Sequence, residues 1–169
     1  MSNSSDSSDA SDTHPGTPGD ETRARLERAH RAFSHTVPHN NALGIEILDL
    51  RDGEADMRMP WAPHLVGNPD TGVLHGGVIT ALLDACCGAA VFQALREPKP
   101  IATLDLRIDY MKPPRPRAEV HARATVTKVT RNVAFVRAAA HHGDPEDPVA
   151  TASASFMLGT PSGPPPEQP

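Results

Sequence analysis

The chain has 169 residues, enough for one domain with a hydrophobic core, and a formal net charge of −5 at pH 7. Four aspartates within residues 1–20 and Glu167 account for this charge, so residues 21–159 carry no net charge. A nucleic-acid-binding domain would normally be strongly basic, and this balance argues against that class.

Both ends of the chain differ in composition from its middle. Residues 1–20 consist mostly of Ser, Asp, Thr, Pro and Gly, and residues 160–169 read TPSGPPPEQP. Such segments bury too little apolar surface to offset the entropy lost on ordering. We therefore predict two disordered tails around one folded domain, residues 21–159. This domain begins with a predicted amphipathic helix over residues 21–36, which Pro38 ends.

A hairpin is predicted next. Residues 44–50 alternate in the manner of a half-buried strand, with Asp49 provisionally on the inward face. Asp52–Gly53 is a strong hairpin-turn signal, and the alternation over residues 55–59 predicts the second strand. Residues 60–75 form a long loop with three prolines, and a loop of that length within a compact domain is usually functional.

Residues 76–95 form an apolar run, GGVITALLDACCGAAVFQAL, whose single charge is Asp84. Its length suits a membrane span, but a central aspartate would cost about 2.5–3.5 kcal/mol there, and strand-like segments follow. We therefore predict a helix buried in the core of a soluble domain. The adjacent Cys86 and Cys87 cannot form an ordinary disulfide, and the N-terminus lacks the layout of a signal peptide, so we expect a cytoplasmic protein.

Four more strands are predicted after the helix. In the first of them Leu104 and Leu106 share one face, and Thr103 lies on the other. These strands cover residues 103–110, 120–127, 133–138 and 149–158. The order of two strands, one long helix and four strands predicts the α+β class, with one antiparallel sheet around one buried helix.

Two segments of the chain carry a resemblance to a known family: GVLHGGVITALLD, which ends at Asp84, and TLDLRIDYMKP (residues 103–113). The first is similar to the His-Gly-Gly and helical Asp of the PaaI-type thioesterases, which have the hotdog fold. The second is similar to the strand after the helix in that family. The resemblance covers about residues 41–158. It implies a curved antiparallel sheet of five to six strands wrapped around the central helix, with two subunits forming active sites at their interface.

The resemblance also implies a role for each matching residue. Asp84 would act as general base on water or as direct nucleophile. The N–H of Gly76 would polarise the thioester carbonyl, and His75 would orient this turn. Asn68 would help to position water, although it lies one residue farther from His75 than in close relatives. Thr103 falls where a relative has a hydroxyl residue that orients water or the catalytic group.

Helix geometry supports these roles independently. A helix N-terminus offers unpaired N–H donors and a partial positive charge, which suit a developing oxyanion, and Gly76 and Gly77 let a substrate approach the backbone closely. Asp84 lies eight residues after Gly76, or about 12 Å along the helix. Both groups of one subunit cannot easily flank one carbonyl. Two head-to-tail subunits could supply one each, which predicts an obligate dimer or a dimer of dimers.

Other interpretations apply to several of these residues. Asp84 could instead be a structural carboxylate paired with an Arg of a neighbouring strand. The cysteines are expected to be core residues, and His141–His142 lacks the spacing of metal ligands, so we expect no metal site and no cofactor other than the CoA of the substrate. Cations in turns beside the site should meet CoA phosphates, and we select Lys112 and Arg131 for this role.

The sequence thus predicts an acyl-CoA thioesterase, with no nucleic-acid or membrane partner. Two alternatives stay open. Asn68–Pro69 hints at the Asn-Pro step before the His of hotdog hydratases and dehydratases, and a non-catalytic acyl-CoA-binding module would also fit the fold. The acyl group is not readable from the sequence, nor is the choice between dimer and tetramer.

Overall fold

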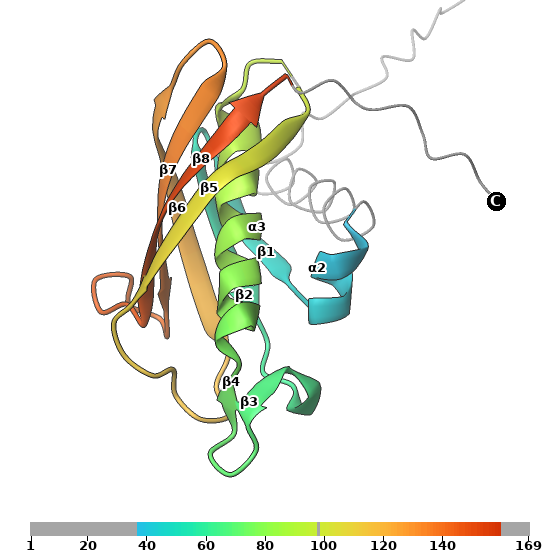
Figure 1. Ribbon diagram of the computed structural model, residues 1–169, viewed down its shortest axis with the longest axis vertical. Coiled ribbons are helices and arrows are strands. Elements are labelled where there is room, and N and C mark those ends of the chain that lie inside the picture. Colours follow the sequence, from blue (N-terminus) through green and yellow to red (C-terminus); the bar gives the residue numbers. More distant parts are fainter. Residues whose placement is uncertain (1–36, 98, 160–169) are drawn as a thin grey trace, which may run out of the picture.

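Six strands form one antiparallel sheet that wraps around a single long helix, α3 (Gly76–Ala94), in the computed structural model (Figure 1). The model describes residues 37–97 and 99–159. The strand order is β1-β2-β6-β7-β8-β5. The predicted α+β fold is confirmed, and the predicted helix 76–95 agrees with α3 to within one residue. The two predicted tails and the helix predicted over residues 21–36 lie outside the described residues.

Pro38 begins a helix rather than only ending one. The short helix α2 (Pro38–Leu43) carries this proline in its first turn, where a missing N–H leaves no intrahelical hydrogen bond unmade. It ends at Gly44, whose φ of 69° lies in the left-handed region that favours glycine. The residue pattern predicts no helix or strand over residues 38–43.

The predicted hairpin is β1 (Glu46–Arg51) and β2 (Glu54–Met59), but its inward face differs from the prediction. The pairing register shifts between Ile47 and Asp49, so one extra residue enters β1 as a β-bulge. Leu50 therefore lies in the core, and the inward placement of Asp49 was wrong. The Asp49 carboxylate instead lies 3.2 Å from the guanidinium of Arg51.

Three central strands present a face of alanines to the helix. They are β6 (Val120–Val129), β7 (Val133–His141) and β8 (Ala150–Leu158), and their alternation follows the predicted pattern. The buried alanines are Ala122, Ala124, Ala134, Ala138, Ala140, Ala150, Ala152 and Ala154. Side chains this small allow the helix to approach the sheet closely, since interiors are packed without large voids.

The second half of α3 also buries several small residues. Ala85, Gly88 and Ala89 are buried beside Cys86, whose thiol donates to the carbonyl of Ala55 on β2 at 3.3 Å. By length and composition α3 could cross a membrane, but more than half of it is buried within the protein. It is therefore the core helix of this fold, as the sequence analysis predicted.

Strand β5 (Ile101–Tyr110) is an edge of the sheet and contains a second bulge. Its register against β8 shifts between Thr103 and Asp105. Because one extra residue enters the strand there, Thr103 lies on the same face as Leu106, toward α3. The prediction that Thr103 faces away from Leu106 was therefore wrong, and the apolar Leu104 is 52% exposed.

The predicted loop 60–75 contains short elements of its own. A 3₁₀ turn, η1 (Pro63–Leu65), leads into a two-stranded hairpin of β3 (Val66–Asn68) and β4 (Val73–Leu74). Strand β4 ends one residue before the N-cap of α3. The hairpin therefore lies at the N-terminal end of the helix (Figure 1).

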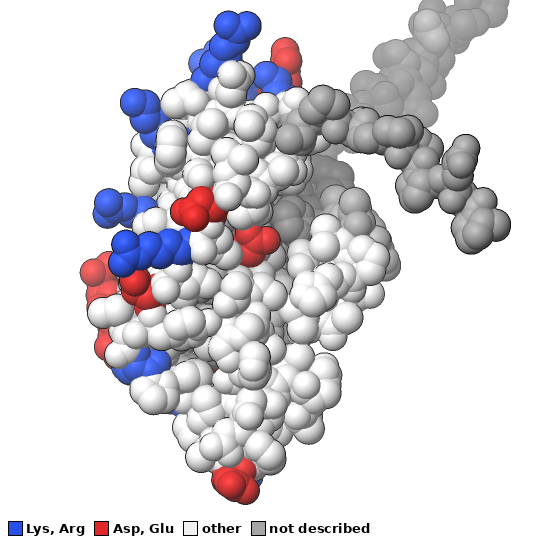
Figure 2. All heavy atoms as spheres, viewed as in Figure 1, with Lys and Arg blue, Asp and Glu red and all other residues white. Residues whose placement is uncertain are grey.

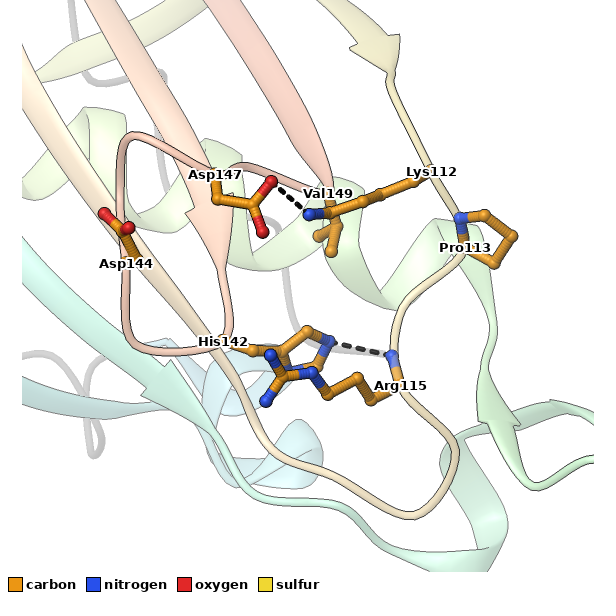
Figure 3. A pocket seen from close by; sticks show the side chains of 7 residues that line it. All are labelled: Lys112, Pro113, Arg115, His142, Asp144, Asp147 and Val149. Atoms are coloured by element: carbon orange, nitrogen blue, oxygen red, sulfur yellow. Dashed lines mark hydrogen bonds and ion pairs between the residues drawn. The ribbon is translucent and has the colours of Figure 1, made fainter.

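His142 ties the connection between β5 and β6 to the turn between β7 and β8 (Figure 3). Its Nε2 accepts the backbone N–H of Arg115 at 2.9 Å. Its Nδ1 therefore carries the proton and donates to the backbone carbonyl of Glu119 at 2.7 Å. Burial lowers the pKa of His142 below its ordinary value. Protonation of Nε2 would break the hydrogen bond from Arg115.

We predict that the free energy of unfolding decreases as the pH falls below about 6.5, the ordinary pKa of histidine. The lowered pKa of His142 makes the protonated ring less favourable in the folded chain than in the unfolded one, so the loss continues as the pH falls through the folded-state pKa. Urea unfolding between pH 8 and pH 5 measures this decrease. His142→Gln keeps a donor and an acceptor without titrating, and should flatten the decrease.

The exposed His64 provides the control, because His64→Gln should leave the pH dependence unchanged. Burial also lowers the pKa of His141, so part of the decrease should remain in His142→Gln. Identical pH dependence in the wild type and in His142→Gln would contradict the role of this side chain.

Candidate active site

The N-terminus of α3 is shaped by a histidine cap and flanking glycines. His75 is the N-cap residue, and its Nδ1 accepts the N–H of Gly77 at 3.0 Å. A Cβ at Gly77 would lie 3.0 Å from this nitrogen, and a Cβ at Gly67 would lie 2.8 Å from the Cα of His75. Glycine at both positions therefore lets the imidazole fold over the first turn of the helix.

One peptide group in this turn is hydrogen-bonded at both ends. The carbonyl of Gly76 accepts the hydroxyl of Tyr110 at 2.7 Å and also lies 3.2 Å from the hydroxyl of Thr80. This carbonyl and the N–H of Gly77 belong to the same peptide group, so β5 holds one end of it and His75 the other. Its orientation is fixed from two directions.

The N–H of Gly76 belongs to the preceding peptide group and has no hydrogen-bond acceptor among residues 37–97 and 99–159. The first residues of every helix have such unpaired donors, at the positive end of the helix dipole. Gly76 is partly exposed. A free, fixed donor is therefore open to a ligand at this end of α3.

Asp84 lies two turns farther along the same helix. Its Oδ1 accepts the hydroxyl of Thr103 on β5 at 3.0 Å. No arginine of the described chain pairs with Asp84, in contrast to the structural alternative considered from the sequence. The carboxylate is partly exposed in the described chain, whereas the sequence predicted that its helix is buried in the core. Substrate or water can therefore reach it.

The two groups are well separated within a single chain. Gly76 is the first residue of α3 and Asp84 the ninth, which places them about 12 Å apart along the axis. Strand β5 runs beside the helix, with Thr103 at Asp84 and Tyr110 at Gly76. One edge strand therefore positions both ends of this helix face.

Asn68 has a local role in the structure. It ends β3, and its Oδ1 accepts the N–H of Asp70 at 3.0 Å in the turn toward β4. Its own carbonyl accepts the N–H of Gly72 at 2.8 Å. No hydrogen bond joins Asn68 to Asp84 or Thr103 within the described residues. The described chain therefore does not bring Asn68 to the Asp84 carboxylate.

The two cations selected from the sequence lie in different places. Lys112 follows β5, near Gly76, but its ammonium pairs with the carboxylate of Asp147 (Figure 3). Arg131 lies in the turn between β6 and β7, at the C-terminal end of α3 (Figure 1). In this chain, Arg131 therefore lies near the opposite end of α3 from Gly76.

The thiols near the site are not suited to nucleophilic attack. Burial, with a smaller contribution from Asp84, raises the pKa of Cys87 to about 12, and burial raises the pKa of Cys86 well above its ordinary range. Thiolate, the reactive form, is therefore scarce near neutral pH. Among the described residues, no group of three or more His, Cys, Asp or Glu side chains is arranged to hold a metal ion.

Two residues of this region were missed as site residues in the sequence. Thr80 lies midway between Gly76 and Asp84 at spacings of four, so helical periodicity could have placed it on the same face. Tyr110 was predicted only as the last residue of the strand over residues 103–110. Its hydroxyl reaches Gly76 across a sequence separation of 34 residues, a contact that the sequence does not show.

Comparisons with known proteins agree with this architecture. A family model described as "Thioesterase superfamily" matches residues 71–149. The medium/long-chain acyl-CoA thioesterase YigI of Salmonella typhimurium is 31% identical over 147 residues, which cover 79% of this chain and 94% of that relative.

Solved structures are similar over the same region. A Pseudomonas aeruginosa crystal structure has a TM-score of 0.70 and 39% identity, and the match covers 78% of this chain and 97% of that one. The phenylacetic acid degradation protein PaaI of Thermus thermophilus, in a mutant form, has a TM-score of 0.62 and 28% identity over 72% of this chain and 98% of that one. The fold, the helix entry and these relatives agree: the chain belongs to the thioesterase superfamily and has the hotdog fold of its PaaI-like members.

Proposed function

We propose that this protein is an acyl-CoA thioesterase, which hydrolyses an acyl-CoA to a carboxylic acid and free CoA. The observation that carries the proposal is that one helix of a thioesterase fold holds both a free backbone donor, the Gly76 N–H, and a partly exposed carboxylate, Asp84. The YigI relative is named a medium/long-chain acyl-CoA thioesterase, so medium- and long-chain acyl-CoAs are the first substrates to assay.

In the proposed reaction the Gly76 N–H donates to the thioester carbonyl oxygen and stabilises the negative charge that forms on it. Asp84 takes a proton from a water molecule whose oxygen bonds to the carbonyl carbon. Alternatively, its carboxylate attacks that carbon itself. In both routes the C–S bond then breaks, and CoA leaves as a thiolate that takes up a proton. After direct attack, water hydrolyses the resulting acyl anhydride to the carboxylic acid and free Asp84. Thr103 holds the Asp84 carboxylate in position through its 3.0 Å hydrogen bond.

We propose further that each active site is shared between two subunits. Gly76 and Asp84 of one chain are too far apart to act on one carbonyl, so Gly76 would act with Asp84 of the partner subunit. An exposed edge supports this pairing: Leu104 is 52%, Tyr110 50% and Met111 63% exposed on or beside β5. The face that carries α3 and β5 also shows few charged side chains over its lower half (Figure 2).

The first test is Asp84→Asn, which removes the charge and keeps the shape. Release of free CoA thiol from a panel of acyl-CoAs should fall about 10²–10⁴-fold, because general base catalysis typically contributes that much. Asp52→Asn, the same change at an exposed carboxylate in the β1–β2 turn, should leave the rate unchanged, because Asn-Gly suits such a turn as well as Asp-Gly. Unchanged hydrolysis in Asp84→Asn would overturn the assignment. Loss of a crotonyl-CoA double bond without thiol release would favour a hydratase instead.

The shared site is tested by mixing two inactive variants. Gly76→Ala places a methyl group 3.3 Å from the Tyr110 hydroxyl and in the path of the substrate, whereas Asp84→Asn removes the carboxylate. After unfolding and refolding together in equal amounts, the mixture should regain about a quarter of the wild-type rate, because half of the dimers are mixed and each has one intact site. No gain above the separately refolded variants would show that each site uses one chain.

His75 is expected to act as a positioning residue for the Gly76 turn. His75→Ala should cost about 1 kcal/mol of unfolding free energy through loss of the N-cap, and should lower kcat more than it raises KM. His75→Asn offers a side-chain oxygen to the Gly77 N–H and should restore most of both. Urea unfolding and steady-state kinetics measure these effects. An inactive but fully stable His75→Asn would instead indicate that the imidazole itself takes part in the chemistry.

A further inference from the structure

A second cavity lies at the same end of the molecule, beside the β3–β4 hairpin. It has a volume of about 270 Å³ and is lined by Trp61, Pro63, Val66, Pro69, Gly72 and Arg117. Four of these residues have apolar or aromatic side chains, and Arg117 supplies the one charged side chain. The proposed reaction uses none of these residues.

The backbone of Gly72 holds two residues of this cavity, the side chain of Trp61 and the main chain of Arg117. Its carbonyl accepts the indole N–H of Trp61 at 2.8 Å and the backbone N–H of Arg117 at 3.0 Å. A Cβ at Gly72 would lie 2.9 Å from the Cγ of Arg117, and its φ of 73° also favours glycine. The arginine side chain therefore lies directly against the hairpin.

Arg117 has an unusual backbone for an arginine. Its φ of 52° makes it the one non-glycine residue with a positive φ in the described chain. Left-handed backbone is uncommon outside glycine and costs of order 1–3 kcal/mol unless the surroundings hold it, and such residues concentrate at ligand sites. Here the hydrogen bond to Gly72 holds it.

The charge of Arg117 is not neutralised by any carboxylate among the described residues, whereas Lys112 pairs with Asp147. An unpaired guanidinium is a strong donor to phosphate oxygens. The faces of Trp61 and the neighbouring prolines suit a flat ring, because aromatic rings stack on such surfaces. The cavity therefore matches a ligand with a flat ring and a phosphate group.

The position of the cavity relates it to the proposed active site. Gly72 precedes Gly76 by four residues, most of them in extended β4, so the two lie at most about 13 Å apart. The thioester of an acyl-CoA and its nucleotide are joined by the long, flexible pantetheine arm. A thioester held at Gly76 could therefore place the nucleotide at this hairpin.

We propose that the cavity binds the nucleotide end of CoA, with the adenine against Trp61 and a phosphate at Arg117. This inference rests on the proposed function, since it assigns part of the same substrate. It assigns the main phosphate contact to Arg117, in place of Arg131 and the ion-paired Lys112, the two cations selected from the sequence.

Trp61 is the single tryptophan of the chain, so its fluorescence reports directly on this cavity. Titration of the full-length protein with adenosine 3′,5′-bisphosphate should quench or shift the emission saturably, and pantetheine should not. Arg117→Asn, which tolerates the left-handed backbone, should weaken binding at least about tenfold, as expected for loss of a charged hydrogen bond. Arg117→Lys should restore part of it. Arg96→Asn removes an exposed cation elsewhere and should have no effect.

Kinetics separate this inference from the proposed function. Arg117→Asn should raise KM for an acyl-CoA about tenfold with little change in kcat, and should leave hydrolysis of the matching acyl-pantetheine unchanged. Hydrolysis by the wild type without any fluorescence response, or equal losses on both substrates, would overturn the nucleotide site and leave the thioesterase proposal standing. A saturable fluorescence response without hydrolysis of any thioester would overturn the proposed function and the assignment of this nucleotide to its substrate.

Discussion

Close packing of α3 against an alanine-lined sheet is the constraint on which the rest of the molecule depends. The inward faces of β6, β7 and β8 are built largely from alanine, and the helix facing them is rich in Ala, Gly and Cys. Small side chains on both partners bring the backbone of the helix close to the sheet. The positions of Gly76 and Asp84, both on this helix, follow from that packing. Neither group belongs to a loop that could move independently.

Strand β5 provides the second constraint. It touches the helix face at both of the positions that matter, through the Thr103 hydroxyl at Asp84 and the Tyr110 hydroxyl at Gly76. The bulge at Leu104 makes the first contact, because it turns Thr103 toward the helix. As an edge strand with exposed apolar residues, β5 is also the surface that we propose for the second subunit. The spacing of the site and the pairing of subunits thus depend on one strand.

Much of the fold could be predicted from the sequence, because hydrophobic periodicity reports directly on which residues are buried. The alternation in β6, β7 and β8 and the apolar run of α3 gave their positions correctly. The failures share a cause: a bulge adds one residue without any change in composition. The faces of Asp49 and Thr103 were therefore both wrong. Helix α2 was missed for a different reason, since a proline that can end one helix can also begin another.

The candidate site was less predictable than the fold. His75, Gly76 and Asp84 are readable because they are neighbours on one helix, so that sequence spacing is also spatial spacing. The hydroxyl of Tyr110 and the free charge of Arg117 depend on contacts between distant segments. Lys112 was selected as a phosphate contact, but its ammonium pairs with Asp147 in the turn between β7 and β8, a contact that the sequence does not show.

The alanines of the sheet have a consequence for how this protein can tolerate change. None of them touches Gly76 or Asp84 through a hydrogen bond, yet a larger side chain at Ala122 or Ala124, which are fully covered on β6 beside the helix, would occupy the space that the helix needs. The helix would move outward while β5 stayed paired to β8, and the two hydroxyl contacts would lengthen together. Residues that make no chemical contribution would then set the limits on activity, and variants selected for function should conserve size at these positions more strictly than polarity on the surface.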